Sequence, residues 1–136
     1  MMVKDPLENL KIRIEYLKKE TQKNDWGDFG DRHIPSKMWN QCYKDAIWFS
    51  DMSKLGLPFV SPCGDGSIHM CWFHQDGREF VIEIMPWKFS TYTKKDLGGG
   101  LDDLWHWDLR TSDGQWKFGS TSSRSEILEL LKNHLK

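Results

Sequence analysis

The chain has 136 residues, an apolar content of 38%, a charged content of 29% and a formal net charge of −1. This length predicts a single domain over residues 1–136 that can bury enough surface to fold without a metal or a disulfide. The near-zero charge gives no general field for concentrating nucleic acid or an anionic membrane, so neither is favoured as a partner.

Cysteine usage and hydropathy point to a reducing environment. The three cysteines are an odd number, which does not fit a closed disulfide framework. The N-terminus lacks the apolar stretch of a signal peptide, and no run approaches the roughly 20 apolar residues of a spanning helix. We therefore expect a cytoplasmic location. The eight tryptophans predict either a Trp-rich core or an exposed aromatic surface for a partner.

The first predicted element is a helix that begins after Asp5 and ends near Thr21. Asp5 suits the N-cap position and Pro6 suits the first helical position. Apolar residues at three- and four-residue spacing then form one stripe: Leu7, Leu10, Ile14 and Leu17. Basic residues outnumber acidic ones along this helix.

A second helix is predicted after Pro35, with Ser36 as its N-cap and Gly56 as the left-handed residue that ends it. The segment 57–62 contains two prolines, which disfavour helix at the residues before them. We therefore expect this segment to be an extended connector.

The stretch from Ser67 to Met85 predicts a β-hairpin around Asp76-Gly77. A two-residue type I′ turn there would pair Phe73 with Phe80. Because strand side chains alternate, the face directed to the core would carry His69, Cys71, Phe73, Phe80, Ile82 and Ile84. The other face would carry Ile68, Met70, Trp72, Val81 and Met85, together with His74, Glu79 and Glu83.

Three further strands are predicted at residues 88–93, 104–110 and 116–119. Ser123 and Glu126 form a capping box at the start of a closing helix. Helices and strands occur in separate runs, which is typical of the α+β class. The expected fold is an antiparallel β-meander of four to five strands, with two N-terminal helices and one C-terminal helix packed on one face.

From Leu57 to Met85 the chain resembles a pattern in small uncharacterised bacterial and phage proteins. There, a helix and a Pro-rich connector precede Asp-Gly-Gly-Ile-x-Leu-Glu-Trp and a hairpin that ends in Ile-Glu-Ile. The matching residues here are Leu57, Pro58, Pro62, Asp65, Gly66, Ile68, Met70, Trp72, Ile82, Glu83 and Ile84. Cys71 stands where the pattern has glutamate. The resemblance covers residues 36–93 and implies the fold, without implying an activity.

Four residues of the metal-ligating types lie within twelve positions: Cys63, His69, Cys71 and His74. A closed zinc site uses four such ligands, but the spacing Cys-x5-His-x-Cys-x2-His matches no known zinc finger. The predicted hairpin also places His74 on the other face from His69 and Cys71. We expect no metal and no cofactor, and interpret these residues as core cysteines and surface histidines.

His106 and Asp108 share one face of the strand predicted at 104–110. A His–carboxylate pair can orient an imidazole for general-base catalysis. No nucleophile motif such as Gly-x-Ser-x-Gly accompanies the pair, and a hydrogen-bonded structural histidine is the simpler interpretation. A small hydrolase that uses His106, Asp108 and a Cys or Ser from elsewhere in the fold is an alternative function.

The remaining candidate is the second hairpin face, with Ile68, Met70, Trp72, Val81 and Met85 as predicted partner-binding residues. Exposed apolar patches on a sheet mark partner sites, where Trp and Met are enriched. We therefore predict a non-enzymatic protein–protein interaction module, such as an inhibitor or accessory factor of a phage or mobile element. Its partner would be another protein or a second copy of the chain. A further alternative is a weak nucleic-acid binder that stacks Trp on bases beside the basic first helix.

Overall fold

The computed structural model describes residues 5–23, 33–84 and 104–135. Met85 and the strand predicted at 88–93 lie outside these residues. The elements follow the order α1 (Pro6–Glu20), α2 (Ser36–Ser53), β1 (Phe59–Pro62), β2 (Ile68–Phe73), β3 (Glu79–Ile84), β4 (Trp105–Arg110), β5 (Trp116–Thr121) and α3 (Arg124–Leu135). None of the helices in this part of the chain is long and apolar enough to span a membrane.

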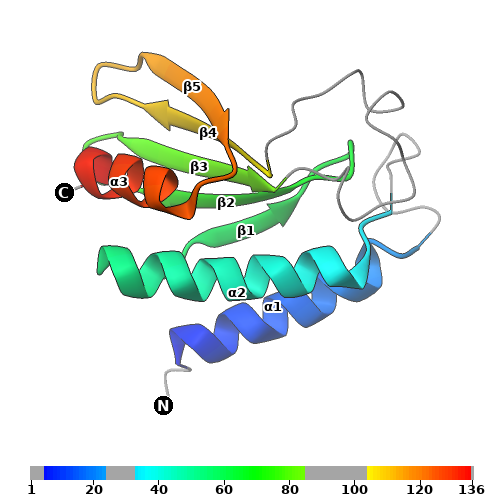
Figure 1. Ribbon diagram of the computed structural model, residues 1–136. Helices are drawn as coiled ribbons and strands as arrows, with labels where there is room; N and C mark the ends of the chain where they lie inside the picture. Colours follow the sequence, from blue (N-terminus) through cyan, green and yellow to red (C-terminus); the bar gives the residue numbers. More distant parts are fainter. Residues whose placement is uncertain (1–4, 24–32, 85–103, 136) are drawn as a thin grey trace.

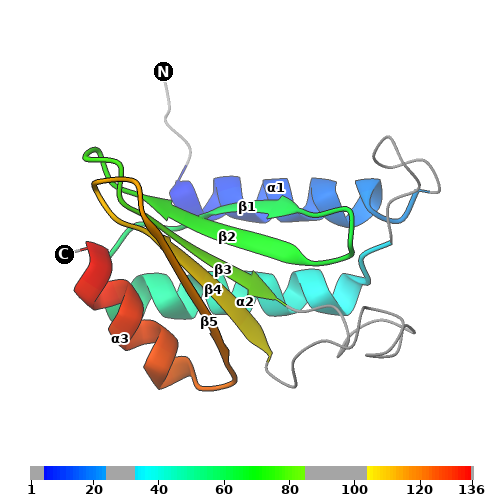
Figure 2. The ribbon, with the colours of Figure 1, turned by 90° about the horizontal axis from the view of Figure 1, so that it is seen from above.

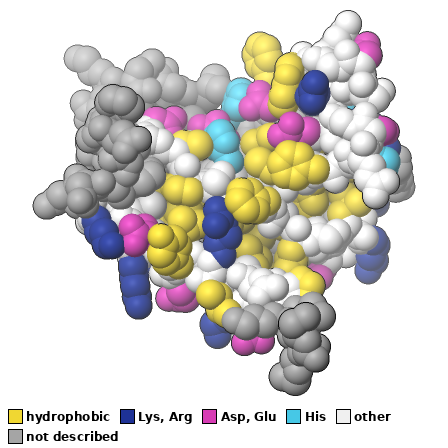
Figure 3. Space-filling model, turned by 180° about the vertical axis from the view of Figure 1, so that it is seen from behind, with side chains coloured by type: hydrophobic (Ala, Val, Ile, Leu, Met, Phe, Trp, Pro, Cys, Tyr) yellow, Lys and Arg dark blue, Asp and Glu magenta, His cyan; other side chains and the backbone are white. Residues whose placement is uncertain are grey.

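The five strands form one antiparallel sheet in sequential order, which confirms the α+β class and the placement of the helices along the chain. Helices α2 and α3 cover one face of this sheet, and α1 packs beside β1 and against α2 (Figures 1 and 2). No described helix lies over the opposite face of the sheet. Figure 3 shows the molecule from that side, behind the view of Figure 1. The segment 57–62, predicted as an extended connector, is extended, but the sequence did not predict that its residues Phe59–Pro62 form β1 and pair with β2.

Local capping explains where the helices begin and end. Asp5 accepts a hydrogen bond from the Leu7 N–H at 3.0 Å, so the predicted cap of α1 is confirmed. Ser123 likewise accepts from the Glu126 N–H at 3.2 Å at the start of α3. For α2 the predicted caps were wrong: Pro35 occupies the N-cap position, so Ser36 is already helical, and Lys54 at φ 64° takes the left-handed position predicted for Gly56.

The hairpin turn at Asp76-Gly77 has a three-residue loop, and the predicted type I′ register was wrong. The His74 N–H donates to the Arg78 carbonyl at 2.9 Å, and Gly77 adopts φ 94°. Trp72 therefore faces Phe80, and Phe73 faces Glu79. A shift of one residue moves every side chain of a strand to the other face of the sheet. In β2 the core residues are thus Ile68, Met70 and Trp72.

The same loop conformation occurs three times in the described residues. The loops are Cys63–Ser67, His74–Arg78 and Thr111–Gln115, and each closes with a backbone N–H to carbonyl bond of 2.8–2.9 Å. Each contains Asp-Gly with the glycine at φ 89–94°. This is the geometry of a type I turn followed by a G1 bulge, which needs a positive φ at the glycine alone.

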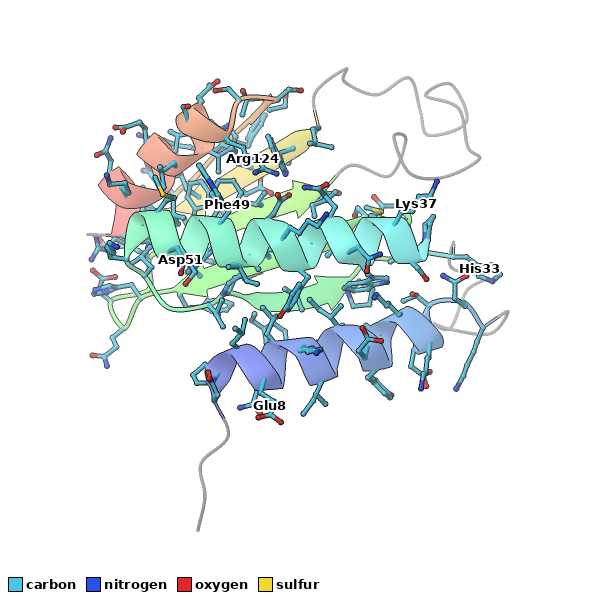
Figure 4. The ribbon with its side chains drawn as sticks, turned by 60° about the horizontal axis from the view of Figure 1, so that its bottom comes forward. Glu8, His33, Lys37, Phe49, Asp51 and Arg124 are labelled. Carbon is cyan, nitrogen blue, oxygen red and sulfur yellow. The ribbon has the colours of Figure 1, made fainter. Side chains whose placement is uncertain are left out.

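The core lies between the sheet and α2. Phe49 of α2 packs edge-on against Trp72 and Trp105, with ring centroids 6.4 and 6.1 Å apart. Figure 4, in which Phe49 is labelled, shows it on α2 beside the sheet. Further buried side chains extend this cluster: Met38, Trp39, Ile68, Met70, Phe80, Ile82, Ile84, Ile127 and Leu131. The stripe of α1 contributes Leu10, Ile14 and Leu17, whereas Leu7 remains exposed.

One buried carboxylate connects three elements across this core. Asp45 of α2 accepts hydrogen bonds from Gln41 at 2.8 Å, from the Trp105 indole at 3.2 Å and from Arg124 at 2.8 Å. Arg124, labelled in Figure 4, lies at the start of α3 and also stacks over Trp48 and Trp105. Burial raises the pKa of Asp45, against the lowering effects of Gln41, Arg124 and Trp105.

The register makes a prediction about three aromatic residues. Phe80→Ala and Trp72→Ala should each lower the free energy of unfolding by about 3–5 kcal/mol, because each removes a buried ring. Phe73→Ala should cost less than about 1 kcal/mol, because Phe73 is 66% exposed. Urea titrations of the three variants measure these costs. A large loss of stability for Phe73→Ala with a small loss for Trp72→Ala would instead support the register of a two-residue turn.

The Asp45 network predicts a pH-dependent effect of Arg124→Met. At neutral pH this variant leaves Asp45 buried without its cation and should lose about 2–3 kcal/mol, less than a fully buried pair because Arg124 is partly exposed. The loss should shrink as the pH falls, because protonated Asp45 needs no counter-charge. Urea titrations at neutral and acidic pH measure the difference, with Glu129→Gln on the exposed side of α3 as control. A loss that stays constant with pH would contradict the pairing.

Candidate functional site: the helix-free face of the sheet

The sheet face opposite α2 and α3, termed here the open face, follows directly from the strand registers. Across the sheet, His69 lies opposite Glu83, which lies opposite His106. The next two rows along the strands complete the open face, which comprises Phe59, Ser61, His69, Cys71, Phe73, Glu79, Val81, Glu83, His106, Asp108, Arg110, Trp116, Phe118 and Ser120. Cys63, directly after β1, continues this face.

Aromatic side chains mark the two sides of the open face. Phe59 and Phe73, on β1 and β2, are 53% and 66% exposed, and Trp116 and Phe118, on β5, are 52% and 74% exposed. The Arg13 guanidinium from α1 lies over the Phe59 ring at 4.4 Å. Figure 3 shows hydrophobic side chains spread across this side of the molecule, with acidic and histidine side chains between them. The two aromatic pairs are large apolar surfaces that the described helices leave uncovered.

A polar row, formed by His69, Glu83 and His106, crosses the sheet next to the row that holds Phe59 and Phe118. His69 Nε2 lies 3.4 Å from Glu83 Oε2, and His106 Nε2 lies 3.3 Å from Asp108 Oδ1. These side chains are between 16% and 34% exposed, so solvent screens them only in part. The open face thus carries both signs of charge beside its aromatic side chains.

The charges in the row stabilise one another. Burial works to raise the pKa of Glu83, but hydrogen bonds from His69 and Ser67 and the charges of His69 and His106 outweigh it and hold the pKa below its usual value. The Cys63 side chain, followed by Glu83, raises the pKa of His69 to about 10 against the effect of burial. At neutral pH, His69 and Glu83 therefore form a charged pair.

Two of the three cysteines belong to this region. Cys63 follows β1 and lies diagonally beside His69, and Cys71 lies between Phe59 and Val81 on neighbouring strands. Burial, followed by the charges of Glu79 and Cys63, raises the pKa of Cys71 to about 11. Cys71 is therefore held as a thiol.

The five predicted partner-binding residues do not form a common surface. Ile68, Met70 and Trp72 are buried beneath the helices, because the three-residue loop shifts the register. Val81 lies on the open face but is only 7% exposed, and Met85 lies outside the described residues. The expectation of one apolar face shared by these residues was wrong.

The residues considered as metal ligands keep the predicted separation of His74 from His69 and Cys71, but His69 and Cys71 lie on the open face and not on the core side. His74 begins the hairpin loop, where its Nδ1 lies 3.0 Å from Asp76 Oδ1, away from His69. Cys63, His69 and Cys71 share the open face. In residues 5–23, 33–84 and 104–135, no group of three or more His, Cys, Asp or Glu side chains has the arrangement of a metal site.

A second surface feature is a shallow groove of about 820 Å³ along α1. Its apolar lining comes from Leu7, Ile12, Tyr16 and Tyr43, and charged residues of α1 border it. Leu7, Ile12 and Tyr16 are exposed on successive turns of α1. Single apolar side chains of this kind are common on the solvent side of a helix. The open face offers larger aromatic surfaces and a defined polar row.

The aromatic residues of the open face were missed as a site because the assumed turn placed Phe73 in the core. The signal that could have found them is the triple occurrence of a five-residue segment with Asp-Gly at its third and fourth positions, in 63–67, 74–78 and 111–115. A shared loop of three residues between closing residues puts Phe73, Trp116 and Phe118 on the face opposite Trp72.

Comparison of the chain with known protein families, with curated proteins and with solved structures finds no match.

The charged pair predicts that His69→Gln lowers stability in a pH-dependent way. Below pH 6.5 the raised pKa of His69 contributes fully, and the contribution is lost as the pH rises toward about 10. The lowered pKa of Glu83 contributes above pH 4.5 and is lost below it. The variant should therefore lose most, about 1–2 kcal/mol, between these limits.

Urea titrations of wild type and His69→Gln across this pH range test the pair. His74→Gln is the matched control, because His74 is paired only with the exposed Asp76 and should change stability by less than about 1 kcal/mol. An effect of His69→Gln that is equal at pH 5.5 and at about pH 10 would show that packing alone, without the charge pair, stabilises this position.

Proposed function

We propose that this protein is a non-enzymatic protein-binding module and that the open face of the sheet is its binding surface. The observation that carries the proposal is the exposure of Phe59, Phe73, Trp116 and Phe118, each by half or more, on a sheet face that no described helix covers. Aromatic side chains are enriched in protein interfaces and supply most of their energetic hot spots.

The polar row supports a protein as the occupant. Glu79 and Asp108 lie between the aromatic pairs, and Glu83 lies in the adjacent polar row. Carboxylates in these positions repel the phosphates of a nucleic acid. A protein surface can instead combine apolar groups for the aromatic rings with polar groups for the row. This favours a protein over the alternative of a weak nucleic-acid binder, even though exposed rings can stack on bases.

The role suggested for such a module is that of an inhibitor or accessory factor. Its assignment to a phage or mobile element rests on the sequence resemblance at residues 36–93. The cysteines Cys42, Cys63 and Cys71 are all free thiols, which supports a reducing compartment such as the cytoplasm.

A small hydrolase remains the second candidate, because His106 and Asp108 lie 3.3 Å apart on the open face. In that role Asp108 would orient the imidazole and His106 would act as a general base. His106→Ala would abolish turnover of an ester substrate if this function were correct. Under the binding proposal the wild type shows no such turnover.

The binding proposal predicts the behaviour of the double variant Phe73→Ser/Phe118→Ser, which changes one ring at each side of the open face. Affinity capture with quantitative mass spectrometry identifies the partner, and calorimetry with the purified partner measures its dissociation constant. The constant should rise about 100- to 1,000-fold, because loss of an aromatic anchor costs roughly 2 kcal/mol. The melting temperature should stay close to that of the wild type, because both rings are exposed.

The double variant Ile12→Ser/Met52→Ser is the matched control, since it removes two apolar side chains outside the open face that are 48% and 49% exposed. It should bind as the wild type does. A partner that binds Phe73→Ser/Phe118→Ser as tightly as the wild type would refute the assigned surface. A saturating single-stranded DNA or RNA complex with submicromolar affinity at physiological salt would replace protein with nucleic acid as the ligand.

A further inference from the structure

Cys63, His69 and Glu83 form a cluster at the end of the open face where the loop Cys63–Ser67 joins β1 to β2. We propose that Cys63 is a nucleophilic thiol assisted by His69 and Glu83, and that it reacts with small disulfides by thiol–disulfide exchange. This reactivity is separate from the proposed binding function, because it requires no partner protein.

The strand register brings the three residues together. Cys63 donates its backbone N–H to the Ser67 carbonyl at 2.9 Å, which continues the pairing of Ser61 with His69 by two residues along each strand. Side chains two residues apart share a face, so Cys63 lies diagonally next to His69. The Cys63 side chain raises the pKa of His69, as expected for side chains in this position. On the other side of the imidazole, Glu83 lies directly across the strand pair with its Oε2 at 3.4 Å from His69 Nε2.

The roles of the three residues follow from this order. A cysteine next to a histidine whose ring is held by a third polar group is the arrangement that activates cysteine nucleophiles. Glu83 pairs with the His69 ring and holds its orientation, and His106 of β4 lies directly behind Glu83. Cys63 is only half-buried and His69 is 31% exposed, so a small molecule in solution can approach the sulfur.

The other two cysteines lack this environment and serve as internal references. Cys42 is fully buried in α2, and burial, followed by the charge of Asp45, raises its pKa far above the usual range. Burial raises the pKa of Cys71 to about 11. A reagent that attacks thiolates should therefore distinguish Cys63 from both.

The exchange step conserves atoms and electrons. The Cys63 sulfur attacks one sulfur of the small disulfide, a bond forms between these two sulfurs, and the original disulfide bond breaks. The Cys63 sulfur is oxidised, and the departing sulfur takes the electron pair and is reduced to a thiolate. The proton of Cys63 passes to solvent, because His69 is already protonated at neutral pH and its positive charge favours the neighbouring thiolate. The leaving thiolate is then protonated from solvent. The charge moves only between sulfur atoms, so the step needs no oxyanion-stabilising donors.

The experiment follows each cysteine by peptide mapping after brief exposure to oxidised glutathione or iodoacetamide. At neutral pH, Cys63 should react about tenfold or more faster than Cys71 and Cys42, and faster than Cys63 of the same protein unfolded in concentrated urea. It should form a mixed disulfide with glutathione. His69→Gln should slow Cys63 about tenfold and move the pH at which its rate rises to higher values.

Several controls separate reactivity from mere exposure. Glu83→Gln retains the size of the side chain and should change the pH profile of Cys63 labelling, whereas His74→Gln should leave it unchanged. Circular dichroism and melting temperature confirm that each variant is folded, and Cys42 labelling reports any opening of the core. If His69→Gln unfolds the chain, the comparison of Cys63 labelling rates between folded and urea-unfolded wild type still tests whether the fold activates Cys63.

Equal rates for Cys63 in the folded and unfolded protein would overturn the proposal. An unchanged pH profile in a folded His69→Gln variant would also overturn it, because the histidine would then have no part in the reaction. Release of p-nitrophenol from p-nitrophenyl acetate with multiple turnovers that require Cys63 would replace disulfide exchange with acyl transfer.

Discussion

The backbone geometry of three Asp-Gly loops determines which side of each strand meets the helices. In all three, the glycine alone takes a positive φ, and the aspartate side chain is free to accept hydrogen bonds inside the loop, as Asp65 does from the Ser67 N–H and Asp76 from the Arg78 N–H. A type I′ turn would require a positive φ at the aspartate as well. Outside the glycines, Lys54 alone has a positive φ in the described part of the chain. Since side chains alternate, this choice directs Trp72 into the core and Phe73 to the open face.

The global fold was predictable because it depends on signals that tolerate small errors. The apolar stripes of α1 and α3, the cap at Ser123 and the strand runs define an α+β chain whatever the exact register. The site was not predictable in the same way, because a change of one loop residue exchanges the two faces of β2. β1 was missed because its flanking prolines suggested a connector. Proline is tolerated on an edge strand, and Arg13 donates from α1 to the Val60 carbonyl at 2.8 Å.

The tryptophans divide between the core and the surface. Trp39, Trp72 and Trp105 are buried, and each indole N–H finds an acceptor: Thr21 at 3.0 Å, Gly56 at 2.9 Å and Asp45 at 3.2 Å. Asp45 lies on α2, and Gly56 follows the end of α2. The hydrogen bonds that they accept from Trp105 and Trp72 therefore also fix the position of α2 on the sheet. Trp107 stacks on Phe80 and lies over Gly119, where a Cβ would approach its ring to 2.6 Å. Trp116, by contrast, is exposed on the open face.

The polar row explains how a sheet can display aromatic residues and still be suited to reversible binding. An apolar open face without charges would favour indiscriminate association between sheets. In the row, His69 and Glu83 already satisfy each other, so covering them with a partner does not leave a single charge buried without its counter-charge. Under the proposed binding function, the aromatic pairs next to the row would contribute apolar contact area and the row would restrict which surfaces fit. Arg13 adds a constraint at the β1 side, because it lies over the Phe59 ring and occupies the Val60 carbonyl that an added strand would use. The same proposal therefore directs recognition at this side to the face of the sheet and away from its edge.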